Sequence, residues 1–126
     1  MVRIARLLAI LAMLLSGTAS ADAPVRVAII IDDLGNNLAL GRQAIQLPAA
    51  ITYSVLPLRP HSRRVAEMAH RAGKEVMLHL PMQALRSRYL GPVGLHEEMG
   101  RDHVVSALRQ GLDDVPHVVG VNNHMG

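Results

Sequence analysis

The chain contains no cysteine, no phenylalanine and no tryptophan, and Tyr53 and Tyr89 are its only tyrosines. Without cysteine, disulfides, thiolate metal sites and cysteine nucleophiles are excluded, so carboxylates and seven histidines remain for chemistry. The scarcity of aromatic rings argues against the base-stacking surfaces of RNA-binding modules. The core must therefore be built from aliphatic side chains and methionine.

Charged residues are also scarce, at 18% of the 126 residues, whereas half of the chain is hydrophobic. This balance predicts a packed core and excludes a disordered chain. The formal net charge is +3, but removing Arg3 and Arg6 of a predicted export segment from the 13 basic residues leaves 11 against 10 acidic ones. We therefore expect no nucleic-acid partner.

Residues 1–21 have the three parts of a secretory signal, namely two arginines, an apolar run over 7–15 and small residues at 19–21. The apolar run is much shorter than the roughly 20 residues that cross a bilayer as a helix. We expect cleavage and no stable membrane span afterwards, with an uncleaved anchor as the alternative. Residues 22–126 are then expected outside the cytoplasm, in the periplasm if the source is a Gram-negative bacterium.

Strand and helix signals alternate along the rest of the chain. β-Branched and apolar runs predict strands over 25–31, 51–55, 75–80 and 117–121. Helices are predicted over 38–46, over a segment ending at Gly73, and over 101–112 with Val104, Val105 and Leu108 on its apolar face. This order predicts an α/β fold with a parallel sheet, either open or part of a barrel.

About four β/α units are too few to close a barrel, and the chain ends where another helix should begin. We therefore expect residues 22–126 to be the N-terminal part of a larger domain. Alone, such a piece would expose a sheet edge and apolar surface, and we expect it to aggregate or fold poorly.

Polar residues gather at the ends of three of the predicted strands. They are Asp32 and Asp33 after the first, His79 at the end of the third, and Asn122, Asn123 and His124 after the fourth. Because the carboxyl ends of parallel strands share one edge, these oxygen and nitrogen donors suit Zn²⁺ or a similar divalent cation. Simpler interpretations remain open, namely a helix cap for the aspartates, a core position for the histidine and an ordinary turn for 122–124.

The other five histidines lie away from this edge and are expected on the surface or in packing contacts. They are His61, His70, His96, His103 and His117.

Four segments of the chain resemble the divergent polysaccharide deacetylase family, relatives of the NodB-type carbohydrate esterases. They are VAIIIDDLG at 27–35, ITYSVLP at 51–57, EVMLHLPM at 75–82 and GVNNHMG at 120–126. The resemblance implies a distorted (β/α) barrel with a metal-dependent hydrolase site at its mouth, of which the first half is present. It also implies that Asp32 is the general base, that Asp33 binds the metal and that His79 is the first histidine ligand.

At the place of the family's second histidine, four residues after the first, this chain has Gln83. We hypothesise that His124 supplies the missing imidazole and that Asn122 or Asn123 orients water or substrate. The roles of the two aspartates could also be exchanged.

The resemblance implies hydrolysis of the amide bond in N-acetylated envelope polysaccharide, with a divalent metal such as Zn²⁺ as cofactor. The altered histidine motif favours an alternative, a catalytically inactive periplasmic barrel that binds glycan or an envelope partner. A further alternative is another metal-assisted hydrolase, such as a phosphoesterase. The sequence identifies neither the acid that protonates the leaving amine nor any protein partner.

Overall fold

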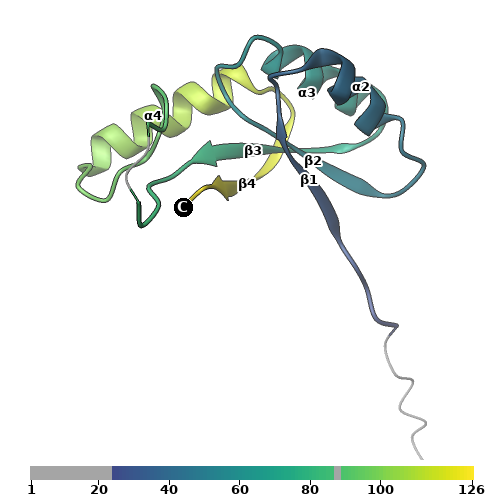
Figure 1. The fold of residues 1–126 in the computed structure, drawn as a ribbon, viewed down its shortest axis with the longest axis horizontal. Helices are drawn as coiled ribbons and strands as arrows, with labels where there is room; N and C mark the ends of the chain where they lie inside the picture. Colours follow the sequence, from purple (N-terminus) through teal and green to yellow (C-terminus); the bar gives the residue numbers. More distant parts are fainter. Residues whose placement is uncertain (1–23, 87–88) are drawn as a thin grey trace, which may run out of the picture.

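The computed structural model describes residues 24–86 and 89–126, which form a four-stranded parallel sheet and three helices (Figure 1). The elements are β1 (Ile29–Leu34), α2 (Leu38–Ile45), β2 (Ile51–Val55), α3 (Ser62–Arg71), β3 (Glu75–Pro81), α4 (Arg101–Asp114) and β4 (Val118–His124). The predicted α/β class is confirmed. The predicted export segment, residues 1–21, lies outside the described residues. No helix in the described part of the chain is long and apolar enough to cross a membrane.

The order of the strands distinguishes a barrel from an open sheet. The strands follow one another as β1-β2-β3-β4, and each neighbouring pair is parallel. Right-handed crossovers that always advance in one direction place all helices on the same face of the sheet. Figure 1 shows this arrangement, with α2, α3 and α4 together above the strands. A doubly wound sheet would reverse its order and carry helices on both faces. The fold is therefore part of a (β/α) barrel.

Side-chain alternation gives the sheet two different faces. Tyr53 and Val55 of β2 and Leu78 of β3 are fully buried and belong to the core beneath the helices. Because successive side chains of a strand point to opposite sides, Ser54 and His79 face the side without helices. The aliphatic core thus lies on one side of the sheet, and polar groups gather on the other.

Local signals mark the start of one helix and the end of another. Asn37 Oδ1 accepts hydrogen bonds from the backbone N–H groups of Ala39 at 2.9 Å and Leu40 at 3.1 Å, so Asn37 caps α2. Gly73 follows the cap of α3 with φ 69°, the left-handed conformation that favours glycine.

The predicted bounds of two strands are wrong. β1 begins at Ile29 because β2 starts opposite it, which leaves residues 25–28 without a strand partner. β4 extends to His124 because residues 122–124 pair with residues 79–81 of β3. The polar residues expected in loops behind these strands therefore lie inside the strand ends.

The apolar face predicted for α4 is also shifted. Val105 is 36% exposed, whereas Ala107 and Gly111 are buried. A Cβ atom at position 111 would lie 3.1 Å from a methyl group of Leu78. The helix packs on β3 through small residues because they let its backbone approach the sheet closely.

Tyr53 links the sheet to α2 through its hydroxyl group. The side chain is fully buried, and its O–H donates to the Ala44 carbonyl at 2.6 Å. Burial raises the pKa of Tyr53 above its usual value because the charged phenolate would lose its hydration. The folded state thus holds the phenol proton more tightly than the unfolded chain. This contribution to stability is full below about pH 10 and is lost as the pH rises through the folded pKa.

We expect Tyr53→Phe to lower the free energy of unfolding of the full-length protein by about 0.5–1.5 kcal/mol at neutral pH, because the hydrogen bond from the tyrosine hydroxyl to the Ala44 carbonyl is lost. The variant should also lose less stability than the parent above about pH 10. Denaturant titrations at the two pH values measure both effects. Tyr89→Phe is the matched control because Tyr89 is 91% exposed. Equal losses in the two variants would contradict this role of Tyr53.

Candidate metal centre

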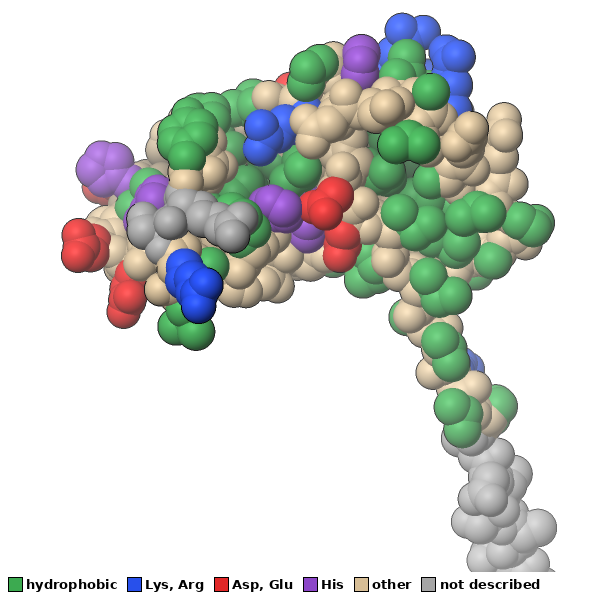
Figure 2. All heavy atoms as spheres, viewed as in Figure 1, with side chains coloured by type: hydrophobic (Ala, Val, Ile, Leu, Met, Phe, Trp, Pro, Cys, Tyr) green, Lys and Arg blue, Asp and Glu red, His purple; other side chains and the backbone are tan. Residues whose placement is uncertain are grey.

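Side chains from all four strands meet on the polar face of the sheet, near the carboxyl ends of the strands. They are Asp32 and Asp33 of β1, Ser54 of β2, His79 of β3, and Asn122 and His124 of β4. The register between β3 and β4 places His79 opposite Asn122 and Pro81 opposite His124. Figure 2 shows acidic and histidine side chains adjoining one another on the displayed face.

A bulge in β1 brings both aspartates to this face. In a regular strand, neighbouring side chains point to opposite sides, so only one of Asp32 and Asp33 could face His79. The register with β2 shifts between Ile31 and Leu34, and Asp33 has φ 63°. As a result, Asp32 Oδ1 lies 3.8 Å from His79 Nδ1, and Asp33 Oδ1 lies 3.2 Å from His79 Nε2. The bulge thus places the two carboxylates at the two nitrogens of one imidazole.

Three ligand atoms form a compact triangle. Asp33 Oδ1 lies 2.9 Å from His124 Nδ1 and 3.2 Å from His79 Nε2, and the two nitrogens are 3.1 Å apart. In a tetrahedral zinc site with bonds of about 2.0–2.1 Å, neighbouring ligand atoms are about 3.3–3.4 Å apart. The triangle matches one face of such a tetrahedron to within a few tenths of an ångström. The residues therefore fit a metal ion with one further position open.

Burial falls steadily across this triangle. The side chain of His79 is 4% exposed, that of His124 is 24% exposed and that of Asp33 is 67% exposed. One edge of the triangle thus rests in the protein while the other meets solvent. The Asp33 side of the triangle is therefore accessible to water.

Asn122 connects the triangle to the second carboxylate. Its Nδ2 donates to Asp32 Oδ1 at 2.9 Å, and its Oδ1 lies 2.9 Å from His79 Nδ1. Ser54, which is fully buried, also donates to Asn122 Oδ1. Sequence reasoning missed Ser54. The available signal was the alternation in β2, where Thr52 and Ser54 interrupt an apolar strand on its second face.

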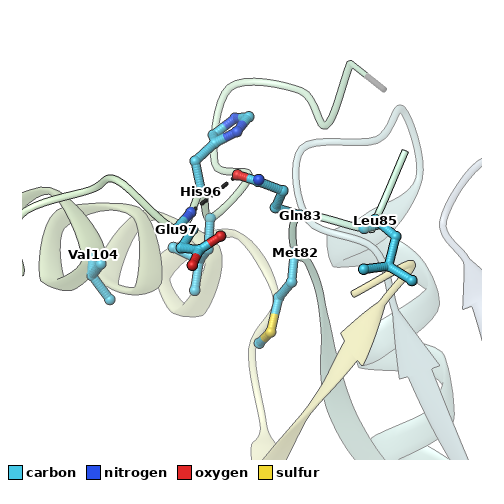
Figure 3. A pocket seen from close by; sticks show the side chains of 8 residues that line it. Met82, Gln83, Leu85, His96, Glu97 and Val104 are labelled. Carbon is cyan, nitrogen blue, oxygen red and sulfur yellow. Dashed lines mark hydrogen bonds between the residues drawn. The ribbon is translucent and has the colours of Figure 1, made fainter. Parts of the chain in front are cut away.

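Two predicted site residues, Gln83 and Asn123, form hydrogen bonds outside the triangle. Gln83 Oε1 accepts a hydrogen bond from the Glu97 backbone N–H at 3.1 Å. This contact crosses a pocket of about 560 Å³ between the loop after β3 and the start of α4, as Figure 3 shows. Asn123 donates to the Gly126 carbonyl. Neither contact involves the three atoms of the triangle.

Among the histidines expected in surface or packing positions, two lie against each other. The rings of His70 and His117 stack with centroids 3.8 Å apart. His61 is half-buried beside the start of α3, and His96 and His103 are exposed.

Comparisons with known proteins agree with the arrangement of the strands. The sequence profile of a family described as "Divergent polysaccharide deacetylase" matches residues 29–126. The "Uncharacterized protein YibQ" of Escherichia coli K12 is 42% identical over 101 residues, which cover 80% of this chain and 32% of that protein. An "Uncharacterized protein" of Haemophilus influenzae is 29% identical over 109 residues, covering 86% of this chain and 39% of that protein. The chain thus spans about a third of the length of the curated relatives it matches.

A solved structure has the same fold. It is described as "uncharacterized protein ATU2773 from Agrobacterium tumefaciens C58" and superposes with a TM-score of 0.75 at 24% sequence identity. The match covers 85% of this chain and 45% of that one. This similarity supports the fold alone.

Proposed function

The chain belongs to the divergent polysaccharide deacetylase family, and from this premise we propose that it forms part of a metal-dependent hydrolase. The proposed reaction removes acetyl groups from N-acetylated polysaccharide of the cell envelope. The observation that supports this proposal best is the triangle of Asp33, His79 and His124, whose ligand atoms lie 2.9–3.2 Å apart. Family membership alone would not establish the reaction, because proteins of one fold can have different functions.

Asp33, His79 and His124 would hold the ion, with Zn²⁺ the best fit to two nitrogens and one oxygen in a tetrahedral face. When bound, the ion would supply a Lewis acid for the acetamide carbonyl and would make a water molecule more acidic. His124 takes the place of the histidine that Gln83 replaces in the sequence motif. The gap in that motif is thus filled by a residue from the neighbouring strand.

Asp32 is suited to accept the proton of the attacking water. It lies beside the triangle without joining it, and its side chain is 45% exposed. One of its oxygens is held by Asn122 Nδ2, so the other can face the solvent side. The different contacts of the two aspartates favour the assignment of Asp32 as base and Asp33 as ligand over the exchanged one.

We also propose that the protein is exported and cleaved after residue 21, because residues 1–21 have the composition of a secretory signal. In a Gram-negative source, the site would then meet envelope polysaccharide in the periplasm. The mass of the mature N-terminus tests this step, and a protein that retains residues 1–21 would contradict it.

The metal centre is tested by the zinc content of the full-length protein. We expect one ion per chain, and we expect His79→Ala and His124→Ala each to weaken zinc binding by more than about a hundredfold, because loss of even an outer partner costs 10–100-fold. His103→Ala is the control, since this exposed histidine lies in the first turn of α4. Full zinc content in both ligand variants would contradict the assignment.

The reaction is tested by acetate release from N-acetylated oligosaccharide with full-length protein. We expect release to require the metal and Asp32→Asn to lower kcat by about 10²–10⁴-fold, the usual contribution of a general base, with zinc retained. Asp102→Asn, in the exposed first turn of α4, should leave the rate unchanged.

Two results would contradict the deacetylase proposal, and a third would contradict only the assignment of the base. Metal binding with no turnover would indicate a non-catalytic barrel that binds glycan or an envelope partner. Release of phosphate from a phosphoester, with no acetate from the glycan, would indicate a different metal-assisted hydrolase. Unchanged turnover in Asp32→Asn would contradict the role of Asp32 as base.

A further inference from the structure

We infer that Asn122 is a positioning residue that keeps the proton of His79 on Nδ1 and thereby turns the lone pair of Nε2 toward Asp33 and His124. The role of this tautomer in metal binding rests on the proposed metal centre. The tautomer itself belongs to the metal-free protein and can be observed without any metal or substrate.

The orientation of the Asn122 amide follows from its contact with Asp32. An ionised carboxylate can only accept hydrogen bonds. The Asn122 atom that lies 2.9 Å from Asp32 Oδ1 must therefore be the Nδ2 donor, as the structure has it. A flipped amide would set two acceptor oxygens against each other. The carbonyl oxygen of Asn122 is consequently fixed on the side of His79.

The protonation of His79 follows from the amide orientation. Asn122 Oδ1 accepts only, and it lies 2.9 Å from His79 Nδ1, so Nδ1 must carry the proton of this hydrogen bond. A neutral imidazole has one N–H, and its second nitrogen carries a lone pair. Nε2 of neutral His79 is therefore the free acceptor, and it is the atom that lies in the triangle with Asp33 and His124.

This tautomer makes the triangle rich in acceptors. With His79 Nε2 unprotonated, the Asp33 carboxylate and Nε2 face each other at 3.2 Å with no proton of their own between them. His124 Nδ1 lies 2.9 Å from Asp33 Oδ1 and 3.1 Å from His79 Nε2. A single N–H on His124 Nδ1 can donate a good hydrogen bond to only one of these two acceptors. A cation placed against all three atoms removes this repulsion. The network around Asn122 thus prepares the triangle for a metal ion.

Ser54 adds a second hydrogen bond to the Asn122 carbonyl oxygen. Its hydroxyl donates to Asn122 Oδ1, so this oxygen receives two donors, one for each of its lone pairs. Ser54 and His79 are both buried, which protects these hydrogen bonds from exchange with bulk water. One side chain from each strand takes part, namely Asp32, Ser54, His79 and Asn122. The network therefore forms only when all four strands are in register.

Asn122 also contacts both a proposed metal ligand and the proposed base. One end of its amide orients a metal ligand, and the other end orients the carboxylate proposed as base. Outer partners of metal-bound histidines commonly set the tautomer and the ring orientation in this way. Here an amide carries out this task for the ligand and positions the base at the same time.

The test is nitrogen NMR of the metal-free, full-length protein with ¹⁵N-labelled histidine, above about pH 8, where imidazoles are mostly neutral. Long-range couplings from the ring protons report which nitrogen carries the proton. We expect His79 as the Nδ1–H tautomer, and we expect Asn122→Ala to abolish this preference because Nδ1 then loses its acceptor. Asn123→Ala, whose amide turns to the Gly126 carbonyl, is the matched control and should not change the signal.

An Nε2–H tautomer of His79 in the unmutated protein would overturn the inference, and this result needs no variant to fold. Loss of the Nδ1–H signal in Asn123→Ala as well as in Asn122→Ala would also overturn it. Zinc affinity is measured on the same samples, and Asn122→Ala should lower it by about 10–100-fold. An Nδ1–H tautomer in a protein that binds no zinc would support the inference and contradict the proposed metal centre, so the two failures are distinguishable.

Discussion

The pairing of β3 with β4 is the constraint on which the rest of the site depends. It places His79 opposite Asn122 and Pro81 opposite His124, so one proposed ligand, its hydrogen-bond partner and a second proposed ligand share one face. A slip of one residue would turn every β4 side chain to the other face and bring Asn123 in place of Asn122.

The same register brings the residues of the proposed site together within these four strands. The three proposed ligands and the proposed base come from β1, β3 and β4, and β2 contributes the serine that supports them. Their positions depend on backbone pairing and on one bulge, which are internal to the four strands. The hydrophobic core under the helices thus lies on one face of the sheet, and the polar groups of the proposed site lie on the other face.

Much of this fold could be predicted from local sequence signals. The alternation of apolar runs with amphipathic segments gave the α/β class, and Asn37 and Gly73 marked helix ends through their own conformational preferences. The positions of Asp32, His79 and His124 near strand ends suggested a common edge. These predictions succeeded because each depends on residues that are close in sequence or on a general rule of parallel sheets.

Other features depend on partners that the local sequence does not show. The start of β1 is set by where β2 begins, and the end of β4 is set by β3. The left-handed conformation of Asp33, which turns both aspartates to one face, has no signature in an Asp-Asp pair. The roles of Ser54 and Asn122 appear only when their hydrogen bonds across the sheet are known.

We propose that Asp33, His79 and His124 bind one ion together. Zinc-edge X-ray absorption of the zinc-loaded, full-length protein tests it most directly, because it reports the atoms around the ion. We expect two imidazole nitrogens and carboxylate or water oxygens at about 2.0–2.2 Å from the ion. A shell without imidazole scattering would contradict it.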